Sequence, residues 1–418
     1  MSWSPIPTHR RTWSRHWRPT VSRCIVSDRC AVAAEPKASG AVQVSVAVTF
    51  LVHALLFASW TAHIPQIKAQ LRLSDGALGI ALLGAPIGSV LAMVASGALL
   101  PRLGSRRMIR VSVVGYAIGG VAVGLADSPV LLFGALAVWG LFQGALDVAM
   151  NTQAVTVERA AGTAIMARLH GLWSIGGFLG ALIGAGAVAA GLGLTAQLFV
   201  LGVVAVAVIG WLSRAMLADG ARPRETRPPR RSRLSPLVAI LGGIAFASML
   251  CEGAAADWSA NYLRDDLGAG PALGGLGYAA YALAMVAVRL GGTILERRFR
   301  IDRLLPALST VFALGMTTAL LVAQPIPALL GFAAMGIGLA LIVPSAFSAA
   351  GRADPGPNSG SAIATVSALG WLGYVSGPPL IGHLADRVGL GTALWTLPLL
   401  ALAITAIARF GGFFTQNR

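Results

Sequence analysis

Twelve apolar stretches, each long enough to cross a lipid bilayer, fill most of the chain between residues 41 and 412. A membrane-spanning helix needs about 20 apolar residues, because the hydrocarbon core is about 30 Å thick. Such stretches must be helical, because lipid offers the backbone no hydrogen-bond partner. Only 11% of the residues are charged, against about 25% in soluble domains. The sequence therefore predicts an all-α membrane protein.

The predicted spans form two groups of six. They cover residues 43–63, 76–100, 107–127, 129–152, 164–190 and 194–215, then 237–262, 272–295, 303–323, 326–350, 360–385 and 391–412. The expected domains are a basic tail (1–40), a six-helix bundle (41–215), an Arg- and Pro-rich central loop (216–235), a second six-helix bundle (236–412) and a short tail (413–418).

The net charge of +16 is arranged along the chain as membrane topology requires. If the N-terminus lies inside the cell, 27 of the 32 Lys and Arg residues fall on the inner side and four fall outside. This asymmetry is the positive-inside rule. It predicts a protein of the cell (inner) membrane, expected to be a monomer, with both termini in the cytoplasm. No globular module remains to bind nucleic acid.

The sequence contains no sign of a cofactor or an enzyme. Its three cysteines, Cys24, Cys30 and Cys251, have neither the spacing of metal ligands nor that of a disulfide framework. No nucleotide-binding loop and no nucleophile–base spacing occurs. We therefore expect no cofactor, no metal and no catalytic residues. The partners that remain are the lipid bilayer, a small-molecule substrate and protons.

The second half of the chain repeats the first. The segment ASWTAH at residues 58–63 returns as ADWSAN at residues 256–261, and Trp173 returns as Trp371. Six helices are thus followed by six related helices in the same orientation. Transporters are built from repeats of this kind, with the substrate site near the midplane between them.

A family resemblance rests on the loop after the second span. Residues 97–107 read GALLPRLGSRR, which resembles the loop signature of the major facilitator superfamily, although Pro101 stands where that signature has Asp. A second copy, at residues 292–300, keeps a carboxylate at Glu296. The resemblance implies two pseudo-symmetric six-helix bundles and transport by alternating access. It also implies a gating role for Arg102 and Glu296.

A narrower resemblance lies on the fourth span. Residues 146–151, LDVAMN, are similar to a patch in fucose-permease-like proton symporters and their uncharacterised bacterial neighbours. In that branch the acid takes part in proton coupling. The resemblance implies a coupling role for Asp147 and places Asn151 at the substrate site.

Five ionisable residues lie within the predicted spans, where a charge is costly and usually marks a pathway or a partner. They are Asp147, His170, Glu252, Asp257 and Arg289. None has an ionisable counterpart in the other half, which favours function over architecture. His170 lies at a depth similar to that of Asp147, so the two could exchange a proton. Glu252 could form an ion pair with Arg289 or titrate by itself.

The remaining predictions concern aromatic residues and the substrate. Trp173 and Trp371 either flank the cavity or pack a symmetric helix crossing. Trp60 and Trp258, at helix ends, fit interfacial anchors, and we group them with Asp257 as gate residues. His53 and Cys251 occupy equivalent positions and are interpreted as packing residues.

These observations predict a secondary active transporter. Proton coupling is assigned to Asp147, His170 and Glu252, and substrate binding to Asn151, Trp173, Arg289 and Trp371. The expected activity is proton-coupled symport of a sugar-like or organic-acid solute. The alternatives are a proton-driven exporter of drugs or metabolites, and a membrane receptor that keeps the transporter fold.

Overall fold

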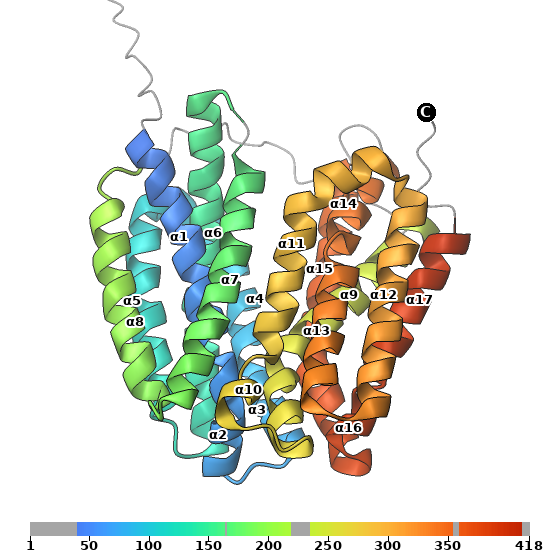
Figure 1. The fold of residues 1–418 in the computed structure, drawn as a ribbon. Coiled ribbons are helices and arrows are strands. Elements are labelled where there is room, and N and C mark those ends of the chain that lie inside the picture. The colour runs from blue at the N-terminus through green and yellow to red at the C-terminus, as the bar shows by residue number, and fades with distance from the viewer. Residues whose placement is uncertain (1–39, 164, 219–234, 354–358, 412–418) are drawn as a thin grey trace, which may run out of the picture. The chain divides into compact units, whose positions relative to one another are not determined.

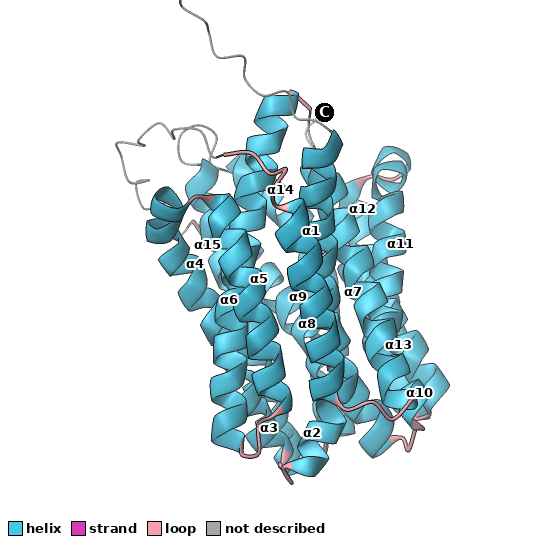
Figure 2. Cartoon of the chain, turned by 90° about the vertical axis from the view of Figure 1, so that its left-hand side faces the viewer, coloured by secondary structure: helices cyan, strands magenta, loops and turns pink. Residues whose placement is uncertain are grey.

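The computed structural model describes residues 40–163, 165–218, 235–353 and 359–411. All of these described residues belong to one compact unit. The basic tail, with Cys24 and Cys30, lies outside the described residues, as does the central loop from residue 219 to residue 234. Within the described ranges every regular element is a helix (Figure 2).

Nine helical elements make up the first half. They are α1 (Gly40–Ser59), η1 (Thr61–His63), α2 (Ile64–Gln70), α3 (Asp75–Leu82), α4 (Gly84–Leu103), α5 (Ser105–Gly124), α6 (Pro129–Ala161), α7 (Met166–Ala189) and α8 (Leu194–Leu212). The second half contains α9 (Pro236–Asn261), η2 (Tyr262–Asp266), α10 (Pro271–Gly274), α11 (Gly277–Arg298), α12 (Ile301–Val322), α13 (Pro325–Leu339), α14 (Ile342–Ala353), α15 (Ser359–Val388), α16 (Leu390–Ala393) and α17 (Thr396–Phe410).

Ten helical segments among the described residues are long and apolar enough to cross a membrane. The predicted all-α membrane fold is therefore confirmed, although the count of twelve spans is not confirmed in full. The two remaining long helices are α11, with 22 residues, and α15, with 30. Arg289 lies on α11, and α15 contains Pro378 and Pro379.

The sequence repeat reappears in the packing of the helices. Helix α1 packs on α7 as α9 packs on α15, and α4 packs on α6 as α11 packs on α13. Likewise, α5 contacts α6 and α8 as α12 contacts α13 and α17. Helix α1 begins and α17 ends at the same end of this unit (Figure 1). A chain that crosses the membrane an even number of times begins and ends on the same side.

Glycines on α7 allow it to lie directly against α1. A Cβ atom at Gly176, Gly180 or Gly184 would collide with backbone carbonyl oxygens of Leu51, Leu55 and Ser59, respectively. Small residues at every fourth position form one face of a helix, and two backbones can approach closely along such a face. The contact of α1 with α7 therefore depends on these glycines.

Helix α6 ends nine residues later than its apolar run predicted, at Ala161 instead of residue 152. The extension, QAVTVERAA, mixes polar and apolar residues, and its Glu158 carboxylate accepts hydrogen bonds from the backbone N–H groups of Ile165 (2.6 Å) and Met166 (2.8 Å). Glu158 thereby satisfies donors at the start of α7, which have no partner within that helix. An apolar run predicts the part of a helix that lies in lipid. The helix itself can extend further into water, because its backbone hydrogen bonds do not depend on apolar side chains.

One end of the unit is closed by contacts between the two halves. There α3 packs on α15, and α2 packs on α9. We call it the Lys68 end, because it carries Lys68, Asp75, Asp265 and Asp386. In Figure 1 it is the lower end, opposite the start of α1 and the end of α17.

Candidate functional site

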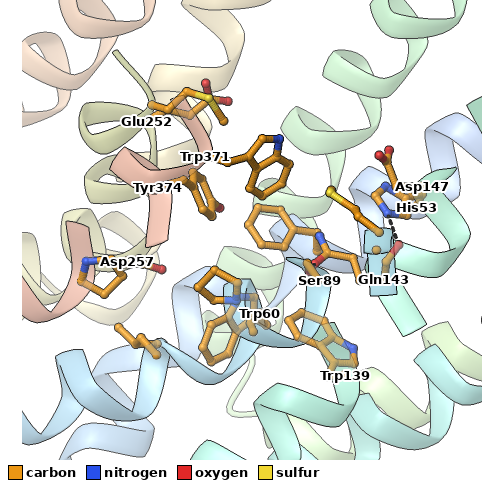
Figure 3. A pocket seen from close by; sticks show the side chains of 18 of the residues that line it. His53, Trp60, Ser89, Trp139, Gln143, Asp147, Glu252, Asp257, Trp371 and Tyr374 are labelled. Atoms are coloured by element: carbon orange, nitrogen blue, oxygen red, sulfur yellow. Dashed lines mark hydrogen bonds between the residues drawn. The ribbon is translucent and has the colours of Figure 1, made fainter. Parts of the chain in front are cut away.

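A cavity of about 180 Å³ lies between the two halves. Helices α1, α3, α4, α6 and α7 line it from the first half, and α9, α11 and α15 line it from the second. Figure 3 shows its labelled residues. Six predicted site residues line it, namely Trp60, Asp147, Trp173, Glu252, Asp257 and Trp371. The fold thus brings together residues that are up to 311 positions apart.

The walls of the cavity are aromatic. Its aromatic lining residues are Phe57, Trp60, Trp139, Trp173, Tyr278, Trp371 and Tyr374. Trp139 has its ring centroid 5.7 Å from that of Trp60, edge-on, and 6.4 Å from that of Phe57, stacked. Trp371 meets Tyr374 edge-on at 5.7 Å. The rings support one another and form rigid apolar walls.

Trp60 and Trp258 are both buried, with 3% and 0% of their surface exposed. The expectation that they anchor the membrane interface is therefore wrong. Trp60 lines the cavity, whereas Trp258 lies where α9 meets α15, next to Gly382. Helix-end position in the sequence could not reveal this burial, because the contacts come from residues distant in the chain: Trp139 packs against Trp60, and Gly382 lies next to Trp258.

His53 is a cavity residue rather than only a packing residue. Its Nδ1 accepts a hydrogen bond from Trp173 Nε1 (3.0 Å), and its Nε2 lies 3.3 Å from the carbonyl oxygen of Gln143. The indole N–H can only donate, so Nδ1 must be unprotonated and Nε2 carries the hydrogen. These contacts hold His53 as one neutral tautomer and tie α1 to α6 and α7.

Asp147 lies on the cavity side of α6, with Asn151 one turn further along. The Asn151 amide donates to the Asp147 carbonyl oxygen (2.9 Å) and to its carboxylate Oδ1 (3.3 Å). No hydrogen bond or ion pair joins Asp147 to His170. His170 is exposed, and its ring meets Phe50 edge-on at 5.5 Å. Asn151 and His170 are outside the lining.

Glu252 and Asp257 line the cavity from α9. Among the described residues, no hydrogen bond or ion pair reaches either carboxyl group. Arg289 is close enough to Glu252 for an electrostatic interaction. Asp257 has no cation of this kind beside it among the described residues. Tyr278 and Tyr374 are close enough to it for an electrostatic interaction.

Arg289 lies outside the cavity lining. Its Nε donates to the carbonyl oxygen of Ala340 (3.3 Å), and its Nη1 donates to Ser174 Oγ on α7 (3.2 Å). The residue four positions after Ala340 is Pro344, which has no N–H to offer that carbonyl. Arg289 therefore bonds a carbonyl that the helix break leaves free, and it also links the two halves.

Arg102 and Glu296, implied as gate residues by the family signature, are exposed on α4 and α11, away from the cavity. The contacts that close one end involve other residues. Lys68 Nζ lies 2.6 Å from Asp75 Oδ1 and 3.3 Å from Asp265 Oδ2 of the other half. The sequence identified Lys68 only as one of four cations on the outer side. The small number of cations on that side was the one indication of a specific partner for Lys68.

A second contact at the Lys68 end joins α15 to the start of α3. The Asp386 carboxylate accepts a hydrogen bond from Ser74 Oγ (3.0 Å) and lies against the backbone of Gly76. Ser74 is also the N-cap of α3. A side chain at Gly76 would collide with Asp386. A carboxylate at a helix N-terminus is favourable, so α15 caps α3 across the boundary between the halves.

No cluster of three or more potential metal ligands occurs within the described ranges. The lining also contains residues that sequence reasoning did not select: Ser89, Gln143, Trp139, Tyr278 and Tyr374. Ser89 Oγ bonds the Gly140 carbonyl oxygen (2.9 Å) and Gln143 Oε1 (3.2 Å). Neutral polar and aromatic residues are common in membrane helices, so composition gave no reason to single them out.

The chain resembles known membrane transporters over nearly its whole length. The family profile of the Major Facilitator Superfamily matches residues 46–256 and 240–414. An uncharacterized MFS-type transporter of Yersinia pestis is 34% identical over 88% of this chain and 95% of the relative. Membrane protein MosC of Rhizobium meliloti is 32% identical over 90% of both chains.

Solved structures share the fold at low sequence identity. The nucleoside transporter NupG, solved as a mutant, has a TM-score of 0.75 at 11% identity, covering 90% of this chain and all of that one. A bacterial homolog of the human lysosomal transporter Spinster, solved in an inward-facing and occupied conformation, has a TM-score of 0.71 at 14% identity, covering 90% and 98%.

Proposed function

We propose that this chain, which belongs to the Major Facilitator Superfamily, carries a small solute through the cavity between its halves by alternating access. Membership of that family makes it an integral membrane transporter and not an enzyme. The observation that carries the proposal is the position of that cavity. Both halves line it, and one end is closed by contacts between them. Opening the Lys68 end while the other end closes would expose the same residues to the other side.

Transport is coupled to protons through Asp147. A carboxyl group that faces a cavity between apolar helices, with no cation in contact, is costly as a bare charge. Its charge can be removed by a proton or balanced by a ligand. Asn151 donates to its oxygens, which orients the group without neutralising it. Glu252, beside Arg289, is a second candidate for proton transfer. The His170 ring contacts Phe50 and lies near Arg289, and no carboxyl group among the described residues forms an ion pair with it.

The chain lies with both termini in the cytoplasm, as the distribution of its cations favours. The Lys68 end then faces outward, and this structure is closed to the outside. An organic acid fits this cavity poorly, because no Lys or Arg among the described residues lines it.

The proposal is tested with the full chain in proteoliposomes that contain a trapped pH-sensitive dye. Sugars, nucleosides, sugar acids and amines are added outside one at a time. Entry of a solute with protons acidifies the lumen, which identifies a symporter. Entry in exchange for protons makes the lumen alkaline, which identifies an antiporter of the kind that exports solutes. Solute binding without any flux would contradict transport and indicate a receptor.

Asp147→Asn separates coupling from binding. The amide keeps the shape and the Asn151 contact but cannot titrate. We expect solute-driven pH change to fall by at least about tenfold, while exchange of labelled solute persists. Asp302→Asn is the matched control, since Asp302 pairs with the half-exposed Arg300 on the surface (2.9 Å) and lies outside the cavity. Equal loss of exchange and net transport would make Asp147 a substrate or folding residue.

A further inference from the structure

We propose that the solute is an organic cation, with an ammonium group on a compact apolar or hydroxylated body, and that Asp257 is its counter-ion. This inference rests on the transport function proposed above and names the chemical class that the same cavity takes. Three observations carry it: the charge of the lining, the carboxyl group left without a partner, and the aromatic residues beside that group.

The described lining is acidic. It contains three carboxyl groups, Asp147, Glu252 and Asp257, and no Lys or Arg. Its histidine, His53, is held neutral by the indole N–H that it accepts. Arg289 lies behind the lining and offsets part of the Glu252 charge. The low dielectric of a membrane bundle strengthens the attraction of these groups for a positive ligand and their repulsion of a carboxylate ligand.

Asp257 is the carboxyl group best placed for a ligand. Asp147 is hydrogen-bonded by Asn151, and Glu252 has Arg289 nearby. Asp257 has neither kind of partner among the described residues, although its backbone carbonyl accepts from Asn261 (3.5 Å). Asp257 is half-buried. A carboxyl group that faces an apolar cavity is either protonated or paired with a cation, and a cation that enters the cavity would supply the pair.

The aromatic residues near Asp257 suit the same ligand. Tyr278 and Tyr374 are its electrostatic neighbours, and Figure 3 shows Tyr374 and Trp371 between Asp257 and Glu252. Aromatic faces attract ammonium groups, and most strongly quaternary ones surrounded by several rings. A neutral sugar would gain stacking from these rings but would offer no counter-ion to an ionised Asp257.

Three isosteric probes test the proposal on the purified full chain: choline, its neutral isostere 3,3-dimethylbutan-1-ol, and the anion 3,3-dimethylbutanoate. Quenching of tryptophan fluorescence reports binding, because four tryptophans line the cavity. We expect choline to bind at least about tenfold tighter than the alcohol, and the anion to bind most weakly. Choline affinity should rise with pH, because protons compete with the cation for the carboxyl group.

Variants assign the preference to Asp257. Asp257→Asn should bring choline and the alcohol to equal affinity, whereas Asp257→Glu, which keeps the charge, should restore most of the preference. Asp302→Asn should change neither. The melting temperature of each ligand-free variant shows that it is folded. Equal binding of the three probes, tighter binding of the anion, or no binding of choline overturns the proposal, as does an Asp257→Asn variant that still prefers choline.

The two proposals fail in different ways. If choline binds as expected but no solute crosses proteoliposome membranes, the transport function fails and the cation site stands. If sugars or sugar acids drive proton flux while choline does not bind, transport stands and the substrate class is wrong.

Discussion

Arg289 shows how one cation is accommodated inside a membrane bundle without an acid in contact. Its guanidinium fork reaches a carbonyl oxygen on its own half and a hydroxyl on the other half at the same time. Lys has a single nitrogen and cannot reproduce two such bonds in different directions. These two hydrogen bonds account for an arginine at this position. Arg289 does not line the cavity.

A double-mutant cycle between Arg289 and Pro344 tests this explanation. Arg289→Lys should cost about 1–2 kcal/mol of stability. Pro344→Ala supplies the missing N–H, so the Ala340 carbonyl can accept a hydrogen bond from residue 344. In that background the Arg289→Lys cost should shrink by about 0.5 kcal/mol or more. The measurement is thermal unfolding in detergent. If the stability changes of the two single variants add up to that of the double variant, the hydrogen bond from Arg289 to the Ala340 carbonyl does not contribute to stability.

At the scale of elements, the glycine face of α7 sets its distance from α1. Gly180 lies against the Leu55 carbonyl oxygen, whereas Gly186, on the same helix, has open space where a Cβ would lie. The same substitution should therefore have opposite effects at the two positions. Gly180→Ala forces the helices apart and should destabilise the protein by about 1–3 kcal/mol.

Gly186→Ala is the matched control. It removes backbone freedom from the unfolded chain at a helical position and should stabilise by up to about 1 kcal/mol. Both variants are compared with the unmodified protein by melting temperature. Similar effects at both positions would mean that helix propensity, and not the contact with α1, determines the result.

At the scale of the whole molecule, the Lys68 end is where alternating access must break contacts. Ser74 Oγ and Asp386 Oδ2 are 3.0 Å apart across the two halves. A cysteine pair at these positions, in a chain whose native Cys24, Cys30 and Cys251 are replaced, should form a disulfide under oxidation. We expect transport to fall to background when the pair is oxidised and to return on reduction.

The control pair joins residues of one half at the same end. Asp266 Oδ2 accepts from the Gly391 backbone N–H at 2.8 Å, so Asp266→Cys with Gly391→Cys should cross-link without joining the halves. Oxidation should leave transport of this variant largely intact. Full transport by the oxidised Ser74–Asp386 pair would contradict opening at the Lys68 end.

Much of the fold followed from local pattern. The length of the apolar stretches and their lack of charge predicted membrane helices. The repeat between the two halves, in which matching residues lie 198 positions apart, predicted that the halves pack alike. Helix ends were less predictable. Helix α6 continues nine residues beyond its predicted span, because backbone hydrogen bonds hold a helix together whether or not its side chains are apolar.

The amino-acid sequence by itself determined which residues are unusual for a membrane helix: carboxyl groups at bilayer depth, a single arginine within a span, and tryptophans that recur in both halves. Only the tertiary structure decided which of them meet. Asp147, Glu252 and Asp257 share one cavity, whereas His170 and Asn151 lie outside its lining. Lys68 pairs with Asp265, 197 residues away. Such contacts depend on how two helical halves are placed against each other. Periodicity records which face of a helix is buried, and not which partner buries it.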